Sequence, residues 1–276
     1  MSVGLFYLVF GLGVLFLEIV KGHHRGIYTR ADWFTNVLCG AVGMALVRPL
    51  AAVLTAMMFA ALLPESKGAA ADVPVWAGFL VTLVLAELLF YWVHRWAHEG
   101  RGKRPQLEWL WKLHRTHHSG KFMNSIVIWR INLFWALMQP QSLVIGLALY
   151  LGQVPAATAV GLSLYVWNIV THSNFRWDDP IRRHRLFGPA FRALEHVIVS
   201  PGVHHSHHGY GKDGASYRNF AVILSLFDWA FGTLHIPKGR PWKYGVPGPN
   251  AHWSEEVFYP LVRRRPPEKR DGNAAA

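Results

Sequence analysis

Nine of the sixteen histidines in this sequence stand in spaced clusters that could bind metal ions. They are His94, His98, His114, His117, His118, His172, His204, His207 and His208. Because helical side chains three or four positions apart share a face, the His-x3-His and His-x2-His-His spacings can each bring two or three imidazoles to one place. The single cysteine, Cys39, excludes a Cys-rich zinc or iron–sulfur site. The ligands must therefore be nitrogen and oxygen.

The number of imidazoles limits the kinds of metal site that this sequence can form. Imidazole suits zinc, copper, iron and nickel, but nine are too many for one four-coordinate zinc and suit two ions of higher coordination. The first cluster has no glutamate of the His-Glu-x-x-His type, and no glutamate has a histidine three residues later. A His-rich dimetal oxygenase and a non-catalytic membrane carrier of metal or haem remain. A metal-dependent lipid hydrolase would need a carboxylate base that the clusters lack, and a plainer alternative is that these loops serve topology or lipid contact.

The segments that must position the clusters are apolar and long. Only 16% of the residues are charged, against roughly 25% in soluble domains. Residues 2–20 and 73–93 each hold one charged side chain and are long enough to cross a bilayer. Residues 33–63 form either one kinked crossing or a hairpin at Arg48-Pro49, and residues 125–151 and 154–171 are joined by a turn at Gly152-Gln153. We therefore expect an all-α integral membrane protein with four to five transmembrane helices.

The charge pattern orients these segments. The net charge is +12, and basic residues follow the apolar stretches that end near residues 20, 93 and 171. By the positive-inside rule these three regions are cytoplasmic, which gives five crossings with the N-terminus outside. All nine histidines then lie on the cytoplasmic side. The positive charge is explained by topology and anionic headgroups, so nucleic-acid binding is not expected.

Further motifs accompany the histidines. Thr171-His172-Ser-Asn174 follows the last apolar stretch, Ser200-Pro201 precedes His204, and residues 219–233 contain Asn219-Phe220 and Phe227-Asp228-Trp229. With the histidine clusters, this pattern resembles the sterol desaturase and fatty acid hydroxylase superfamily of integral-membrane di-iron enzymes over about residues 80–236.

The resemblance implies a four-helix transmembrane core under a cytosolic cap in which the nine histidines hold two iron ions. It implies an oxidoreductase of lipid metabolism that uses dioxygen to hydroxylate or desaturate an unactivated C–H bond of a lipid. Sterols, fatty acyl chains, sphingoid bases, carotenoids and ether lipids all fit. No fused haem or flavin domain is visible, so the electrons are expected from a separate electron-transfer protein.

Several other side chains are candidates for a place next to the metals. Some hydroxylases of the superfamily have a ligand four residues after His172, where this sequence has Arg176, so Asn174 or water is expected to complete that iron. His196 is a candidate tenth ligand or a neighbour of one. His205 is expected either to donate to a ligand, to face the substrate or to lie on an exposed loop.

Two carboxylates need an explanation as well. Asp228 is expected to orient a ligand histidine through its ring N–H, or to make a helix-end contact near Gly232. Glu87 lies two helical turns before His94 in an apolar segment, where a charge is costly. It is expected to face a polar pocket or a substrate headgroup, or to pair with Arg130 or Arg48.

The domain organisation is simple. Residues 1–262 are expected to form a single membrane-embedded domain, and residues 263–276, with Pro266-Pro267 and a run of charges, a disordered tail.

Overall fold

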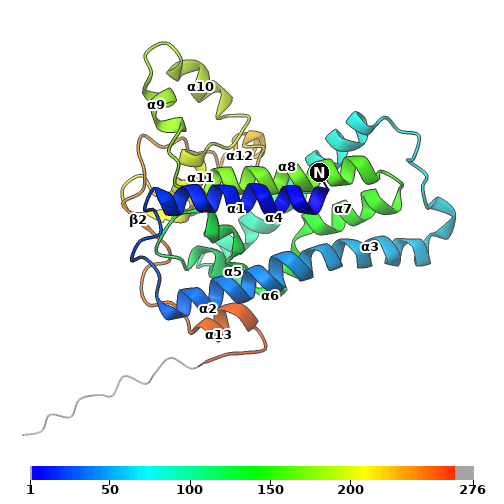
Figure 1. The fold of residues 1–276 in the computed structure, drawn as a ribbon, viewed down its shortest axis with the longest axis horizontal. Helices are drawn as coiled ribbons and strands as arrows, with labels where there is room; N and C mark the ends of the chain where they lie inside the picture. The colour runs from blue at the N-terminus through cyan, green and yellow to red at the C-terminus, as the bar shows by residue number, and fades with distance from the viewer. Residues whose placement is uncertain (1, 265–276) are drawn as a thin grey trace, which may run out of the picture.

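The computed structural model describes residues 2–264, so most of the tail expected to be disordered lies outside the described residues. The described part is almost entirely helical (Figure 1). Its longer helices are α1 (Val3–Val20), α3 (Arg48–Leu62), α4 (Val75–Glu99), α5 (Glu108–His118), α7 (Pro140–Tyr150) and α8 (Val154–His172). The shorter helices are α2 (Arg30–Leu38), α6 (Leu133–Met138), α9 (Asp178–Arg183), α10 (Gly188–Leu194), α11 (Pro201–His208), α12 (Leu226–Ala230) and α13 (Trp253–Phe258). Strands β1 (Gly209–Tyr210) and β2 (Lys243–Tyr244) pair antiparallel, with Gly209 opposite Tyr244.

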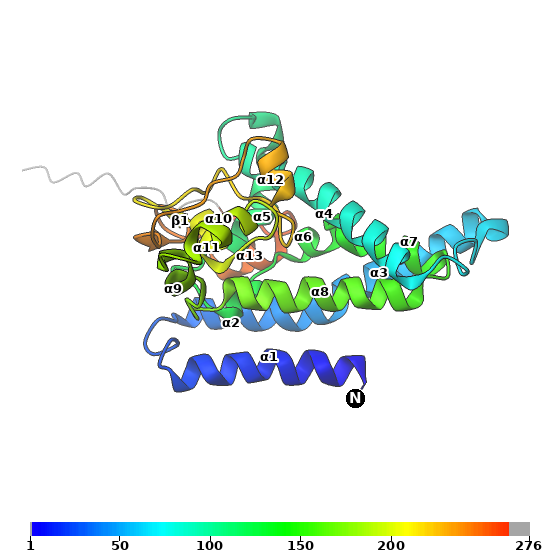
Figure 2. The ribbon, with the colours of Figure 1, turned by 90° about the horizontal axis from the view of Figure 1, so that it is seen from above.

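Three helical segments are long and apolar enough to cross a membrane. They are Arg30–Leu62, Val75–Glu99 and Val154–His172, and shorter apolar helices cover Gly4–Val20 and Pro140–Tyr150. Large apolar side chains on these helices are exposed, as lipid-facing residues would be. Figure 2 shows α1, α3 and α8 lying with roughly parallel axes, with the short helices gathered at one end. A membrane protein built of helices is therefore confirmed, while the number of crossings stays a prediction.

Residues 30–62 form one continuous helical segment, so the hairpin alternative is wrong. Thr29 and Asp32 form a capping box at its start. Residues Cys39–Val47 between α2 and α3 are π-helical, and the Arg48 N–H donates to the carbonyl of Gly43, five residues back. The wider turn accommodates Pro49, which has no N–H to donate and would collide with the preceding turn of a regular α-helix.

Residues 125–151 do not form one continuous helix. A short 3-10 turn (Ser125–Trp129) is followed by an irregular stretch, then α6 and α7. The chain breaks because buried Arg130 turns inward to Asp32 at 2.9 Å and Glu256 at 3.0 Å, and because the Asn132 side chain caps α6. With 11 residues, α7 is about 16 Å long, well short of the roughly 30 Å apolar core of a bilayer.

The turn between α7 and α8 is as expected. Gly152 has a positive φ of 87°, which the missing side chain permits, and α7 packs against α8.

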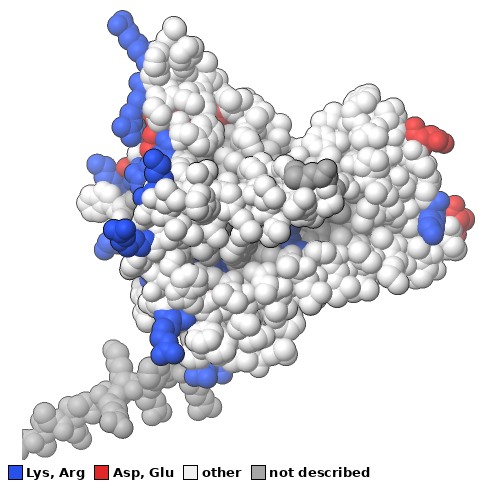
Figure 3. Space-filling view, in the orientation of Figure 1, with Lys and Arg blue, Asp and Glu red and all other residues white. Residues whose placement is uncertain are grey.

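The charges separate along the helix direction. Figure 3 shows Lys and Arg gathered along the end where α1 and α8 finish, and few charges over the middle of the molecule. Exposed Glu65, Lys67 and Asp72 lie at the opposite end. The basic segments predicted to share one side of the membrane are therefore at the same end of the fold.

Apolar packing joins this end to the helices. The core brings together Phe90 of α4, Leu113 of α5, Trp135 of α6, Leu164 of α8 and Val222 of the segment before α12. Helices α4, α5 and α8, which carry six of the nine histidines, thus share one apolar core.

Candidate metal centre

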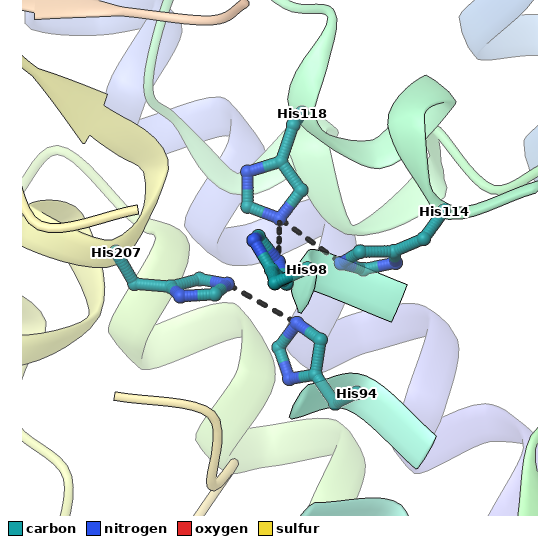
Figure 4. A group of neighbouring side chains, drawn as sticks. All are labelled: His94, His98, His114, His118 and His207. Carbon is teal, nitrogen blue, oxygen red and sulfur yellow. Dashed lines mark hydrogen bonds between the residues drawn. The ribbon is translucent and has the colours of Figure 1, made fainter. Parts of the chain in front are cut away.

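Five histidines converge in one buried group, which we name the five-histidine group. It consists of His94 and His98 from α4, His114 and His118 from α5, and His207 from α11. One ring nitrogen from each residue lies within 4.8 Å of those of the others. Figure 4 shows the rings pointing toward one another from separate elements. The i, i+4 pairs on α4 and α5 supply four of the five rings, as helical spacing requires.

The remaining four candidates form a second set, the four-histidine group. It consists of His117 from α5, His172 from α8, and His204 and His208 from α11, with ligand atoms again within 4.8 Å of one another. The two groups are adjacent, since the rings of His118 and His208 stack with centroids 4.3 Å apart. The structure thus brings all nine predicted candidates together, divided five and four.

Backbone carbonyls fix the proton positions on three of the rings. The His94 Nδ1–H donates to the Phe220 carbonyl at 2.6 Å, that of His207 to Arg218 at 2.8 Å, and that of His172 to Asn168 at 2.8 Å. A carbonyl can only accept, so in the neutral rings each Nε2 carries a lone pair. The Nε2 atoms of His94 and His207 nevertheless lie 3.1 Å apart. Two buried lone pairs that face each other repel, and a cation bound by both nitrogens would remove this repulsion.

The spacing of the nitrogens fits a metal ion. Around an ion with bonds of about 2.1 Å, ligands at right angles lie about 3.0 Å apart and tetrahedral ligands about 3.4 Å apart. In the five-histidine group the Nε2 atom of His118 lies 3.0 Å from His114 and 3.1 Å from His98. In the four-histidine group His172 Nε2 lies 2.9 Å from His204 and 3.2 Å from His117. These distances lie in the range expected for neighbouring ligands of one ion.

Burial also prepares the imidazoles for a metal. Burial lowers the pKa of His114, His118 and His204 well below 6.5, and the neighbouring imidazoles lower it further. For His207 burial lowers the pKa to about 4. The rings are therefore neutral at pH 7, which is the form that binds metal.

The segment that contains the Asn219-Phe220 motif supports the five-histidine group, a role that sequence analysis did not predict. Residues 218–224, which we name the carbonyl segment, supply the Arg218 and Phe220 carbonyls that orient His207 and His94. Glu87 accepts hydrogen bonds from the backbone N–H groups of residues 222–224 at 2.7 to 3.2 Å. Asp228 accepts from the N–H groups of residues 220 and 221, both at 2.8 Å.

The two carboxylates therefore act on the backbone and not on an imidazole. Asp228 also accepts from the Thr233 hydroxyl at 2.7 Å. Glu87 pairs with neither basic side chain suggested for it, because Arg130 binds Asp32 and Glu256 and Arg48 binds Gln141. Glu87 was noticed as a lone charge in an apolar segment, but its backbone partners leave no signal in the sequence.

The other candidates lie outside both groups. His205 is fully buried, with Nε2 3.1 Å from the Ser173 carbonyl and Nδ1 3.3 Å from the Tyr244 hydroxyl, so it is not on an exposed loop. The His196 ring donates to its own helix at Arg192 and packs against Trp229.

The Asn174 region is held by a residue that the sequence marked only as a lone charge. Glu18 at the end of α1 is fully buried and accepts from the backbone N–H of Asn174 at 2.7 Å and from Ser125. The Asn174 side chain lines a surface pocket with Lys21 and Arg176. Glu18 thereby fixes α1 to the chain that follows His172.

Helices of membrane-spanning length and two groups of converging imidazoles define a membrane protein able to hold metal at one end of its helices. The model of the fatty acid hydroxylase family matches residues 79–233, and the chain belongs to this family. The matched range includes all nine histidines of the two groups.

Curated relatives agree with the family. The chain is 27% identical to alkylglycerol monooxygenase of Danio rerio over 194 residues. This aligned region covers 69% of this chain and 38% of that protein. It is 26% identical over 159 residues to very-long-chain aldehyde decarbonylase GL1-10 of Oryza sativa subsp. japonica, covering 57% and 46%. It is 27% identical over 164 residues to methylsterol monooxygenase 1-3 of Arabidopsis thaliana, covering 57% and 47%. The chain spans less than half the length of these relatives, and no solved structure matches it.

Proposed function

We propose that this protein is a membrane-bound di-iron oxygenase that uses dioxygen to hydroxylate or desaturate an unactivated C–H bond of a lipid. The observation that carries the proposal is the division of nine buried histidines into two adjacent groups of five and four. Iron is the metal we propose, because the chain belongs to the fatty acid hydroxylase family and imidazole nitrogens are suitable ligands for iron.

The lipid substrate is inferred from the fold and from the relatives. The relatives are named for alkylglycerols, very-long-chain aldehydes and methylsterols, all of which have long or bulky apolar bodies. The histidine groups lie at one end of helices with apolar outer surfaces, so a lipid could approach them from the bilayer. We propose that this end is cytoplasmic, because the basic residues gather there.

The chain's own residues would hold and shield the centre. The nine imidazoles would bind the two irons, which supply the one-electron dioxygen chemistry that side chains lack. Carbonyls of Asn168, Arg218 and Phe220 keep three rings in the tautomer that leaves Nε2 free. Nearly all of the ligand rings are buried, which keeps bulk water away from the lipid carbon.

The overall reaction needs an electron source. In hydroxylation, one oxygen atom of dioxygen enters the C–H bond and the other leaves as water, which consumes two electrons and two protons. We propose that a separate electron-transfer protein supplies these electrons. Both ligand groups consist only of histidine among the described residues, so they offer no carboxylate base for the hydrolase alternative.

The proposal is tested by labelling. Membranes containing the expressed protein and the host's own reductases are incubated with a total lipid extract under isotopically heavy dioxygen, and the lipids are analysed by mass spectrometry. We expect a lipid that gains one heavy oxygen atom, or one that loses two hydrogens, with the wild type and the His196→Ala control but not with His172→Ala. An unchanged lipid profile in membranes whose protein is loaded with iron would contradict the proposal.

A further inference from the structure

The α9–α10 hairpin, residues 177–197, exposes an apolar surface. At its tip Leu186 is 73% and Phe187 58% exposed, and Leu194 and Val197 are exposed along and after α10. The surface continues onto α12, because the ring of His196 lies 5.4 Å from that of Trp229, which is 57% exposed. We name these five apolar side chains the apolar strip: Leu186, Phe187, Leu194, Val197 and Trp229. A group of large exposed apolar side chains on one projecting element is typical of an interaction site.

The exposed charges beside the strip are all positive. They belong to Arg183, Arg185 and Arg192. The acids of the hairpin point inward to Arg182 and Arg240; they are Asp178, Asp179 and Glu195. Arg183 also reaches Asp179, but only at 3.8 Å and with its side chain 76% exposed. The hairpin therefore presents apolar side chains and cations together, which is the composition of elements that lie on anionic membranes.

The position of the hairpin agrees with its composition. In Figure 1 α9 and α10 project sideways from the body, near the end of α8. Figure 3 shows that Lys and Arg gather along this same end of the molecule. In a protein whose helices cross the bilayer, this level corresponds to the headgroup layer.

We propose that the α9–α10 hairpin lies in the headgroup layer of an anionic leaflet, with the apolar strip among the acyl chains and the three exposed arginines among the phosphates. The inference goes beyond the proposed activity and needs only the membrane location of the chain.

Buried ion pairs connect the α9–α10 hairpin to the helix that carries three of the histidines. Asp178 accepts from the backbone N–H of Gly202 at 2.7 Å, and Arg182 donates to the Ser200 hydroxyl at 3.2 Å. Residues 200 and 202 begin α11, the helix that carries His204, His207 and His208. A hairpin held by lipid would therefore keep α11 at a fixed depth relative to the bilayer.

The depth of the hairpin can be measured with a spin label. Because Cys39 is the one cysteine of the chain, Cys39→Ser gives a background for a nitroxide at Leu186→Cys in the full-length protein. Lys212→Cys, on an exposed loop after β1, is the aqueous reference, and Val81→Cys, exposed on α4, is the lipid reference. Collision with oxygen and with a water-soluble nickel chelate is measured in nanodiscs of phosphatidylcholine with phosphatidylserine.

We expect the ratio of oxygen to nickel collisions at position 186 to exceed that at position 212 several-fold and to approach that at position 81. Replacing Arg183, Arg185 and Arg192 by serine should lower this ratio in the mixed nanodiscs and leave it nearly unchanged in phosphatidylcholine alone. A ratio equal to that at position 212, or a label that neither reagent reaches because protein covers it, would overturn the proposal. A melting temperature and a gel-filtration profile equal to those of the wild type show that the labelled variants are folded, so this result is independent of the metal content and of the oxygenase assay.

Discussion

The five-histidine and four-histidine groups lie side by side but are supported differently. In the five-histidine group, His94 and His207 donate to the carbonyl segment, which Glu87 and Asp228 hold by its backbone. In the four-histidine group, His172 donates to a carbonyl of its own helix and no such segment within residues 2–264 supports the rings. Each group also has two imidazoles whose Nδ1 is buried without a partner among the described residues: His98 and His114 in the first, His117 and His204 in the second. The difference suggests a rigid, ligand-rich site beside a less saturated one with more room for a ligand that is not protein.

Removing one ligand from each group should have the largest effect and should be unequal. His172→Ala leaves three imidazoles in its group, whereas His118→Ala leaves four in the other. We expect His172→Ala to lose about one metal ion per chain and about 100-fold or more in activity, and His118→Ala to retain more of its metal at equal free iron. Metal analysis of both variants after dialysis against a weak chelator measures this. Equal losses of metal from the two variants would contradict the claim that the two groups differ.

Disturbing the carbonyl segment should weaken the five-histidine group alone. Glu87→Ala removes the acceptor of three backbone N–H groups, each worth about 1–3 kcal/mol when buried and unsatisfied. It thereby loosens the carbonyl segment directly after Phe220, whose carbonyl orients His94 and which Asp228 still holds. We expect a drop of about 10–100-fold in affinity for one of the two metals. Glu87→Gln keeps one carbonyl oxygen as acceptor, so its affinity for this metal should lie between those of the wild type and Glu87→Ala. Equal weakening of both metals in a titration would argue against a local role.

Acid should destabilise the metal-free protein. Burial lowers the pKa of His207 to about 4 and lowers the pKa of His204 and His208 as well, whereas the unfolded chain has histidine pKa values of about 6.5. Between about pH 4 and pH 6.5 the unfolded state thus binds more protons than the folded state. The free energy of unfolding is therefore highest above about pH 6.5 and falls as the pH drops toward 4. For His207 alone the loss amounts to about 3 kcal/mol.

The measurement is the melting temperature of chelator-treated protein at several pH values. Replacing one histidine of either group should reduce the fall in melting temperature at low pH by a similar amount, because imidazoles in both groups are buried. A melting temperature that does not change over this range would show that the groups are open to water.

A contact outside both groups should matter least. Tyr244→Phe removes the 3.3 Å contact to His205, whose other nitrogen reaches the Ser173 carbonyl next to His172. We expect a loss of about 0.5–1 kcal/mol in the free energy of unfolding and unchanged metal content. Chemical denaturation beside metal analysis checks both values, and loss of metal would mean that His205 positions the four-histidine group more directly than its contacts suggest.

Helical spacing made eight of the nine histidines predictable, since residues three and four apart must share a face wherever the helix lies. His172 stands alone in the sequence and was predicted from its place after the last apolar stretch and from the resemblance. Composition likewise predicted the long apolar helices. The break within residues 125–151 was not predictable, because Arg130 finds its partners 98 and 126 residues away along the chain. The Asn219-Phe220 motif of the carbonyl segment was recognised, but its contacts with the histidines were not predictable, because backbone carbonyls belong to every residue and leave no local pattern. Glu87 and Glu18 could be recognised as unusual from their apolar surroundings, but their partners are set by the tertiary fold.

The central claim is that the two histidine groups hold two irons, and metal content tests it most directly. Detergent-purified protein from iron-replete cells is analysed by mass spectrometry for all transition metals, beside a variant with His117→Ala and His207→Ala and beside the His196→Ala control. We predict about two irons per chain in the wild type and the control, and their loss in the double variant. One zinc, a haem, or no metal in protein that is folded as before would contradict the account.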